Sequence, residues 1–206
     1  RRLIGRCQTS RILICHLGHG CSASAVRDGK CIDTTMGFTP LDGLMMATRC
    51  GAIDPGIVLY VQQYHGLSAD EVYKVLYERS GLLGVSGISA DLRDILAAAE
   101  AGDSSAALAI SLFCYSVQKT IAALTVPLGG IDALVFSGGI GENSSVIRAK
   151  ICARLQHFGI LLDEAANVSP AEDGDIAASN SPARIFVIAS REDLTLLREL
   201  RNYLHR

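Results

Sequence analysis

Two glycine-rich segments follow short apolar runs, and their placement restricts the fold more than any other feature of the sequence. Residues 11–16 and residues 133–136 are apolar, short and bounded by polar residues, which is typical of buried strands. The first run leads into His16-Leu-Gly-His-Gly-Cys-Ser22, and the second leads into Ser137-Gly-Gly-Ile-Gly-Glu-Asn143. Because ligands of α/β folds bind beyond the carboxyl ends of the strands, a binding site is expected where these segments lie.

The rest of the chain predicts a mixed sheet with helices on its faces. Asp28-Gly29 is typical of a hairpin turn between two further strands, and Asp54-Pro55 and the capping box Ser68-Ala-Asp-Glu71 mark helix starts. No repeat or linker divides the 206 residues, so one α/β lobe is expected. The further strands are predicted at 22–27, 30–34 and 184–189, the helices at 54–65, 68–79, 92–101, 104–126, 145–158 and 191–204, and the loops at 36–54, 81–87, 137–143 and 168–182.

Composition argues against several classes of protein. Hydrophobic residues make up 49% of the chain and charged residues 19%, which indicates a compact domain. The net charge of −2 provides no basic surface for nucleic acid. None of the seven cysteines falls in a Cys-x-x-Cys pair, so a zinc ribbon is not suggested, and reduced thiols in the cytoplasm are expected. No stretch approaches the roughly 20 apolar residues of a membrane span, so no membrane partner is expected.

Both glycine-rich segments have the chemistry of a phosphate-binding loop. Gly18 and Gly20 let the backbone turn sharply and present N–H groups to an anion. The second segment allows close backbone approach, and a helix starting after it would favour a negative group. The alternatives are an ordinary tight turn for the first segment and a glycine cap for the second. Neither segment fits the Gly-x-Gly-x-x-Gly fingerprint, and the chain has no P-loop motif, so those two nucleotide-binding folds lose support.

Arg49 is a third candidate, because it ends an uncharged run that begins at Gly43. A lone guanidinium among Met, Thr and Gly needs an anion, and it offers paired donors to a phosphate or carboxylate. The alternative is an ion pair with Asp42 or Asp54. Two weaker signals are the helix start Ser89-Ala-Asp-Leu-Arg93, with Ser89 or Asp91 as its cap, and Glu192 at the start of the last helix; ordinary capping explains both equally well.

Taken together, these segments resemble the acetate kinase (acetokinase) family. The resemblance runs from about residue 11 to the end of the chain and implies a ribonuclease-H-like lobe of the actin, Hsp70 and sugar-kinase type. Residues 1–206 would then be the single C-terminal, nucleotide-binding lobe of a two-lobe kinase, a fragment that starts after the N-terminal lobe. The matching stretches are Cys15-His-Leu-Gly-x-Gly20, Asp33-Thr-Thr-Met-Gly-Phe-Thr-Pro-Leu41, Gly43-Leu-Met-Met46, Thr48-Arg-Cys-Gly51, Ile53-Asp-Pro55, Ser80-Gly-Leu-Leu-Gly84, Asp91-x-Arg93 and Gly138-Gly-Ile-Gly-Glu-Asn143.

The resemblance also implies roles for individual residues. One position, His19, departs from the family, which usually has asparagine there, so the charge at this position depends on pH. By resemblance, the nucleotide phosphates would face His16, Gly18, His19 and Gly20, and Arg49 would hold the transferring phosphoryl group. The adenosine would lie beside Asp91 and Arg93, and the adenine and ribose pocket would include Gly139, Ile140, Gly141 and Asn143. Mg²⁺ would lie near Glu192.

The activity implied by the resemblance is reversible transfer of the γ-phosphoryl group of ATP to acetate, giving acetyl phosphate and ADP. Such a transfer depends on positioning and on positive charge around the phosphoryl oxygens. The alternatives are a propionate or butyrate kinase of the same fold and a non-catalytic ATP-binding or dimerisation module. The isolated chain is expected to be inactive, and a homodimer through this lobe is expected because the family's dimer contact lies there.

Overall fold

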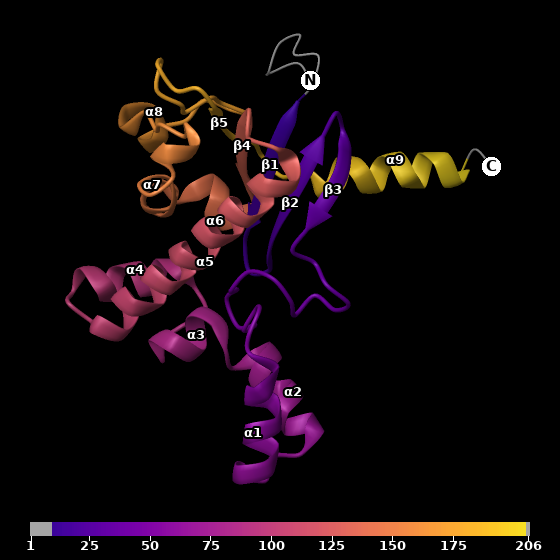
Figure 1. The fold of residues 1–206 in the computed structure, drawn as a ribbon, viewed down its shortest axis with the longest axis vertical. Helices are drawn as coiled ribbons and strands as arrows, with labels where there is room; N and C mark the ends of the chain where they lie inside the picture. The colour runs from indigo at the N-terminus through magenta and orange to yellow at the C-terminus, as the bar shows by residue number, and fades with distance from the viewer. Residues whose placement is uncertain (1–9, 205–206) are drawn as a thin grey trace.

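The computed structural model describes residues 10–204, except for the side chains of residues 192, 195, 196, 198, 199 and 202. Within this range a five-stranded sheet has the order β3-β2-β1-β4-β5 (Figure 1). β2 is antiparallel to β1 and β3, whereas β4 is parallel to β1 and β5. Every strand predicted from the sequence is therefore confirmed. The strands are β1 (Arg11–Leu17), β2 (Cys21–Arg27), β3 (Lys30–Thr34), β4 (Ala133–Ser137) and β5 (Arg184–Val187).

Most helix starts follow from their capping residues. The Asp54 side chain accepts a hydrogen bond from the backbone of Gly56, and the capping box between Ser68 and Glu71 is formed. Of the two predicted caps, Asp91 is the one at the N-cap position of its helix. The described helices are α1 (Pro55–His65), α2 (Ala69–Glu78), α3 (Gly81–Ser86), α4 (Leu92–Glu100), α5 (Ser104–Leu128), α6 (Gly138–Asn143), α7 (Ser145–Cys152), α8 (Glu164–Val168) and α9 (Glu192–Leu204), with a 3₁₀ turn at Gln156–Phe158.

Three of the predictions for helices and loops between residues 81 and 158 are wrong. The glycine-rich segments 81–87 and 137–143, predicted as loops, contain helices α3 and α6, and the helix predicted at 145–158 ends at Cys152. Helix α3 forms because the amides of Leu82 and Leu83 donate to the carbonyl oxygens of Met46 and Ala47, both at 2.9 Å. These contacts come from a distant loop, and tertiary contacts routinely override weak local propensity.

Helix α5 forms the core on one face of the sheet. It packs on β1, β2 and β3 and on α3, α4 and α7. The sequence predicted an end at Val126, but the helix continues through Pro127 to Leu128 and is capped by Gly129 in the left-handed region. The strand residues that face inward are fully or almost fully buried, and those of β2 are small, which allows close approach: Leu13, Cys15, Leu17, Cys21, Ala23 and Ala25.

The length and composition of α5 correct one expectation from the sequence. Among the described residues, Ser104–Leu128 is long and apolar enough to cross a membrane, although no such stretch was expected. A core helix passes the same test, and α5 packs on strands and helices along its length. The absence of a membrane partner stays a prediction.

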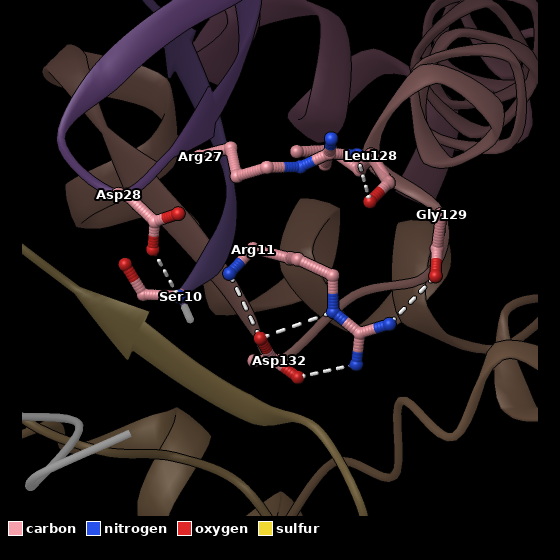
Figure 2. A network of polar contacts seen from close by, with 7 residues as sticks. All are labelled: Ser10, Arg11, Arg27, Asp28, Leu128, Gly129 and Asp132. Atoms are coloured by element: carbon pink, nitrogen blue, oxygen red, sulfur yellow. Dashed lines mark hydrogen bonds and ion pairs between the residues drawn. The ribbon is translucent and has the colours of Figure 1, made fainter. Parts of the chain in front are cut away.

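Two arginines tie the carboxyl end of α5 to the start of β1 and the end of β2 (Figure 2). The Nη1 of Arg11 donates to the carbonyl of Gly129 at 2.6 Å, and its Nη2 donates to the Asp132 carboxylate at 2.6 Å. The Nη2 of Arg27 donates to the carbonyl of Pro127 at 2.7 Å. Cations are favoured at the carboxyl end of a helix, and the Arg11 guanidinium lowers the pKa of Asp132. This clamp lies at the opposite end of β1 from His16.

Candidate functional site

The two glycine-rich segments leave the sheet at the same edge. β1 and β4 run parallel with His16 opposite Ser137, and the His16 Nδ1 lies 3.2 Å from the Ser137 Oγ. Gly138, which follows, has a φ of 78°, and a Cβ atom built on it would lie 2.7 Å from the carbonyl oxygen of Leu17. Glycine is therefore required at position 138, because the two segments touch there through their backbones.

The first glycine pair lies where the chain turns from β1 into β2. Leu17 pairs with Cys21 in the antiparallel ladder, so the predicted sharp turn is present over residues 18–20, and it forms without a positive φ at Gly18 or Gly20. A Cβ atom on Gly18 would lie 3.4 Å from the carbonyl oxygen of Gly20 and 3.7 Å from the amide nitrogen of Gly139. On Gly20 it would lie 3.4 Å from the Arg49 Nη1. A side chain at position 18 or 20 would thus be in ordinary van der Waals contact with the neighbouring segment or with Arg49.

A pocket of about 610 Å³ opens beside these segments. This volume is in the range of small-molecule sites. Its walls come from the first glycine loop, the loop after β3, the start of α4, and α6 with the residue after it. The lining residues, seven of which the sequence predicted, are Gly18, His19, Ala47, Ala90, Asp91, Leu92, Arg93, Leu96, Gly139, Ile140, Asn143 and Ser144.

Asp91 and Arg93 form one polar corner of this pocket. Asp91 accepts from the backbone amide of Arg93 at 2.9 Å, and its carboxylate pairs with the Arg93 guanidinium at 2.5 Å. Hydrogen bonds from Arg93 lower the pKa of Asp91 to about 2. The Arg93 side chain is 87% exposed, so this cation can leave the pair for a ligand without breaking any buried contact.

Gly139 lines the pocket with bare backbone. A Cβ atom built there would meet no other atom within 4 Å, although its neighbour Gly138 is tightly enclosed. Asn143 donates through Nδ2 to the carbonyl of Gly139 at 2.9 Å, which fixes its side chain on the same wall. Gly141 is buried behind this wall. The open side of Gly139 is space for a bound molecule.

Arg49 lies beside the pocket lining and points its guanidinium at Gly20. Its Nη1 donates to the carbonyl of Pro40 at 3.0 Å. Among the described residues it has no ion pair, because Asp54 caps α1 and Asp42 accepts from the amide of Gly43 at 2.7 Å. The alternative of an internal ion pair is therefore not realised, and this half-buried cation is available to an anion.

Comparison with known proteins decides the family. The sequence profile of the acetokinase family matches residues 2–198. The chain belongs to the acetokinase family. It is 47% identical over 194 residues to the acetate kinase of Synechococcus sp. (strain JA-2-3B'a(2-13)), a match that covers 94% of the chain and 48% of that protein. It is 48% identical over 189 residues to the acetate kinase of Carboxydothermus hydrogenoformans, covering 92% of the chain and 47% of that protein. The chain thus spans about half the length of the curated relatives it matches.

Solved structures agree with this assignment. The chain aligns with the crystal structure of Porphyromonas gingivalis acetate kinase at a TM-score of 0.90 and 35% identity, over 95% of the chain and 49% of that structure. It aligns with a propionate kinase from Francisella tularensis at a TM-score of 0.85 and 45% identity, over 91% and 48%. The predicted fold class, a ribonuclease-H-like α/β lobe with a mixed sheet, is confirmed.

The metal prediction concerns a side chain outside the described residues. Glu192 is the first residue of α9, and only its backbone is described. In the described part of this acetokinase chain, no three His, Cys, Asp or Glu side chains gather around one point. Mg²⁺ usually keeps several waters and binds substrate phosphates with one or two carboxylates. A Mg²⁺ site in such a lobe therefore needs no cluster of three protein ligands.

The sequence missed the apolar part of the pocket. Leu92 and Leu96 lie at i, i+4 spacing on one face of α4, and no motif in the sequence marked them as binding residues. Ala90 and Ser144 belong to no sequence pattern that indicates a binding residue. The remaining predicted residues lie nearby without lining the pocket: His16 and Gly20 support the first loop, and Gly141 supports α6 from behind.

Proposed function

We propose that this chain is the C-terminal, nucleotide-binding lobe of a two-lobe acetate kinase, which reversibly transfers the γ-phosphoryl group of ATP to acetate. The observation that carries the proposal is the pocket of about 610 Å³, whose lining gathers Gly18, Asp91, Arg93 and Gly139 from three separate family motifs. The acetate kinases named above match the chain over more than nine-tenths of its length.

In this proposal the pocket binds ATP with its adenosine against α4 and α6. The apolar side chains of Leu92, Leu96 and Ile140 would pack on the base, while Asp91, Arg93 and Asn143 offer polar groups to the ribose. The loop from His16 to Gly20, including His19, would face the phosphates. His19 is exposed at the pocket mouth, and its carbonyl oxygen accepts from the amide of Ala47 at 3.2 Å. That bond holds the two loops together whichever side chain stands at position 19.

The chemical step would be an in-line displacement at the γ-phosphorus. A carboxylate oxygen of acetate forms the new P–O bond, and the bond to the β,γ-bridging oxygen breaks, so that ADP leaves with the electron pair. Arg49 would bind the equatorial oxygens of the phosphoryl group in flight, where a preorganised cation is most effective. Mg²⁺ would supply further positive charge along the phosphates, with Glu192 holding its waters.

For the carboxylate substrate, one comparison supports an alternative to acetate. A propionate kinase matches the chain at 45% identity, nearly as well as the acetate kinases do, so propionate or butyrate is the second candidate. The loop between β3 and α1 leaves Phe38 fully exposed, and Pro40 in the same loop accepts a hydrogen bond from Arg49, which supports an acid pocket completed by the preceding lobe.

We also propose a homodimer in the cytoplasm, without nucleic-acid or membrane partners. Helix α1 leaves none of its residues buried, and it projects with α2 away from the sheet at the bottom of Figure 1. Exposed apolar side chains gathered on one helix mark an interaction site; those of α1 include Ile57, Leu59, Tyr60 and Tyr64. The six described cysteines are all free thiols, which supports a reducing compartment.

The test compares the 206-residue chain with the full-length protein that carries it. The full-length protein should form acetyl phosphate from ATP and acetate, whereas the chain alone should bind ADP weakly and turn over nothing, since losing one charge-stabilising donor already costs about 10²–10³ in rate. Ordinary kinase turnover by the chain alone would refute the two-lobe assignment. ADP binding without turnover in the full-length protein would favour the non-catalytic module. Comparing kcat/KM for acetate, propionate and butyrate identifies the acid.

Leu59→Glu tests the dimer face in the same full-length protein. It places a charge among the exposed apolar side chains of α1 and should convert a dimer into monomers in sedimentation experiments. Asp70→Lys, an exposed charge change on α2, is the control and should leave the dimer intact. A dimer that survives Leu59→Glu would place its contact elsewhere.

A further inference from the structure

Arg148 is the largest fully buried side chain described in the protein, and it has no acidic partner there. It is 1% exposed and forms no ion pair within the described residues. Burial lowers the pKa of its guanidinium, whose ordinary value is so far above neutral that the group stays charged. Burying an unpaired cation is costly unless several hydrogen bonds satisfy it. The hydrogen-bond acceptors around this side chain therefore indicate its role.

All the acceptors of Arg148 are oxygens on two segments. The Nη1 donates to the carbonyl oxygens of Gly141 and Glu142 at 2.9 and 2.8 Å, at the carboxyl end of α6. The Nε and Nη2 donate to the side-chain and backbone oxygens of Asn167 in α8, at 2.8 and 2.6 Å. Asn167, itself 1% exposed, donates to the carbonyl of Ser145 at 2.9 Å. Arg148 thus joins the end of α6 to a rigid, buried asparagine.

Helix α6 depends on such outside support. It has six residues, three of them glycine, and each glycine disfavours a helix by about 1 kcal/mol relative to alanine. The amide of Gly138 at its start is held by the carboxylate of Glu142 at 2.8 Å, and the same carboxylate oxygen accepts from the amide of Ser190 at 2.8 Å. Helix α6 is thus held at its start by Glu142 and at its end by Arg148. Its residues Gly139, Ile140 and Asn143 form one wall of the pocket.

We propose that Arg148 is a positioning residue of the nucleotide site, which acts through the backbone of α6 and touches no ligand itself. The inference rests on the proposed function, because it assigns the wall of the same pocket. Removing the guanidinium leaves two carbonyl groups of α6 without their donor, so the wall loosens where the nucleotide binds. Nucleotide affinity should therefore fall, whereas the acid site and the chemical step at saturating nucleotide should change little.

The experiment uses Arg148→Met and Arg148→Lys in the full-length protein, with Gln118→Met as the matched control. Gln118 is also buried, and its Nε2 donates to two helix carbonyl groups, those of Lys150 and Ile151, at 2.8 and 3.2 Å, but it does not line the pocket. Arg148→Met should raise the Kd for ADP about tenfold or more, the range expected when buried acceptors lose a donor. Arg148→Lys should give an intermediate Kd, and Gln118→Met should lower Tm with a Kd within about twofold of wild type.

Each outcome decides the proposal. If Arg148→Met and Gln118→Met lower Tm equally and neither changes the Kd for ADP, Arg148 is structural only. A rise in the KM for acetate equal to that for ATP would also refute a local effect on the nucleotide wall. If Arg148→Met does not fold, Asn167→Ala decides, since it removes one acceptor of the guanidinium and should still raise the Kd. Failure of the wild-type protein to bind ADP would instead refute the nucleotide site itself.

Discussion

Gly139 offers the sharpest test of where the nucleotide lies. Its added Cβ atom would meet no protein atom within 4 Å, and its φ is not in the left-handed region, so Gly139→Ala fits the fold without strain. The substitution should leave stability unchanged or raise it by about 0.4–1 kcal/mol, because alanine restricts the unfolded chain. The methyl group would instead occupy the pocket. Overpacking of this kind costs about 1–3 kcal/mol, which is about a 5- to 150-fold increase in the Kd for ADP.

The assay pairs calorimetric titration with ADP and thermal unfolding on the same samples. Gly138→Ala is the control with the opposite expectation: its φ of 78° and the carbonyl oxygen of Leu17 at 2.7 Å from the added Cβ atom should make it lose stability first. If Gly139→Ala leaves Tm unchanged and also keeps the Kd for ADP within about twofold of wild type, no bound nucleotide approaches this backbone and the assigned wall is wrong.

Two further predictions test the proposed phosphoryl-binding role of Arg49 and the Arg11–Asp132 ion pair at the opposite end of β1. Arg49→Lys keeps the charge but loses the planar pair of donors, so kcat should fall by about 10²–10³ while the Kd for ADP changes little; a kcat within a factor of two of wild type would make Arg49 structural. Asp132→Asn should lower Tm above about pH 5, because the folded-state pKa of Asp132 lies below its unfolded value of about 3.9. That contribution is fully present above the unfolded pKa and is lost as pH falls through the folded pKa, so the Tm difference should shrink below about pH 4; a constant difference from pH 6 to pH 3 would refute an ionised pair with Arg11.

The elements that the sequence predicted correctly are those fixed by local chemistry. Asp54 with Pro55, the capping box of Ser68 with Glu71, and the Asp28-Gly29 turn act within three or four residues of themselves. Both turn residues have positive φ, 52° and 80°, as a two-residue hairpin turn requires. Such signals need no knowledge of the rest of the chain, which is why the strand and helix boundaries around them agree with the structure to within a residue or two.

The elements that the sequence missed depend on contacts across the fold. Helix α3 exists because its amides reach the carbonyl groups of Met46 and Ala47. A sequence pattern cannot show that residue 46 will lie beside residue 82. The same limit applies to the site. The motifs located Asp91, Arg93 and Gly139, but the apolar face of Leu92 and Leu96 became part of the pocket only once α4 had been placed opposite α6.

The segment Gly138-Gly-Ile-Gly-Glu-Asn143 shows how one motif divides its work between fold and ligand. Gly138 and Gly141 serve the fold: the first touches the backbone of Leu17, and the second is buried and gives its carbonyl to Arg148. Glu142 fixes the start of the helix with one carboxylate oxygen and the approach to α9 with the same atom. Only Gly139, Ile140 and Asn143 remain for the pocket. A short helix with so little propensity can form a defined wall because both of its ends are held by buried or half-buried side chains, and in the proposed site these side chains position the wall without touching the nucleotide.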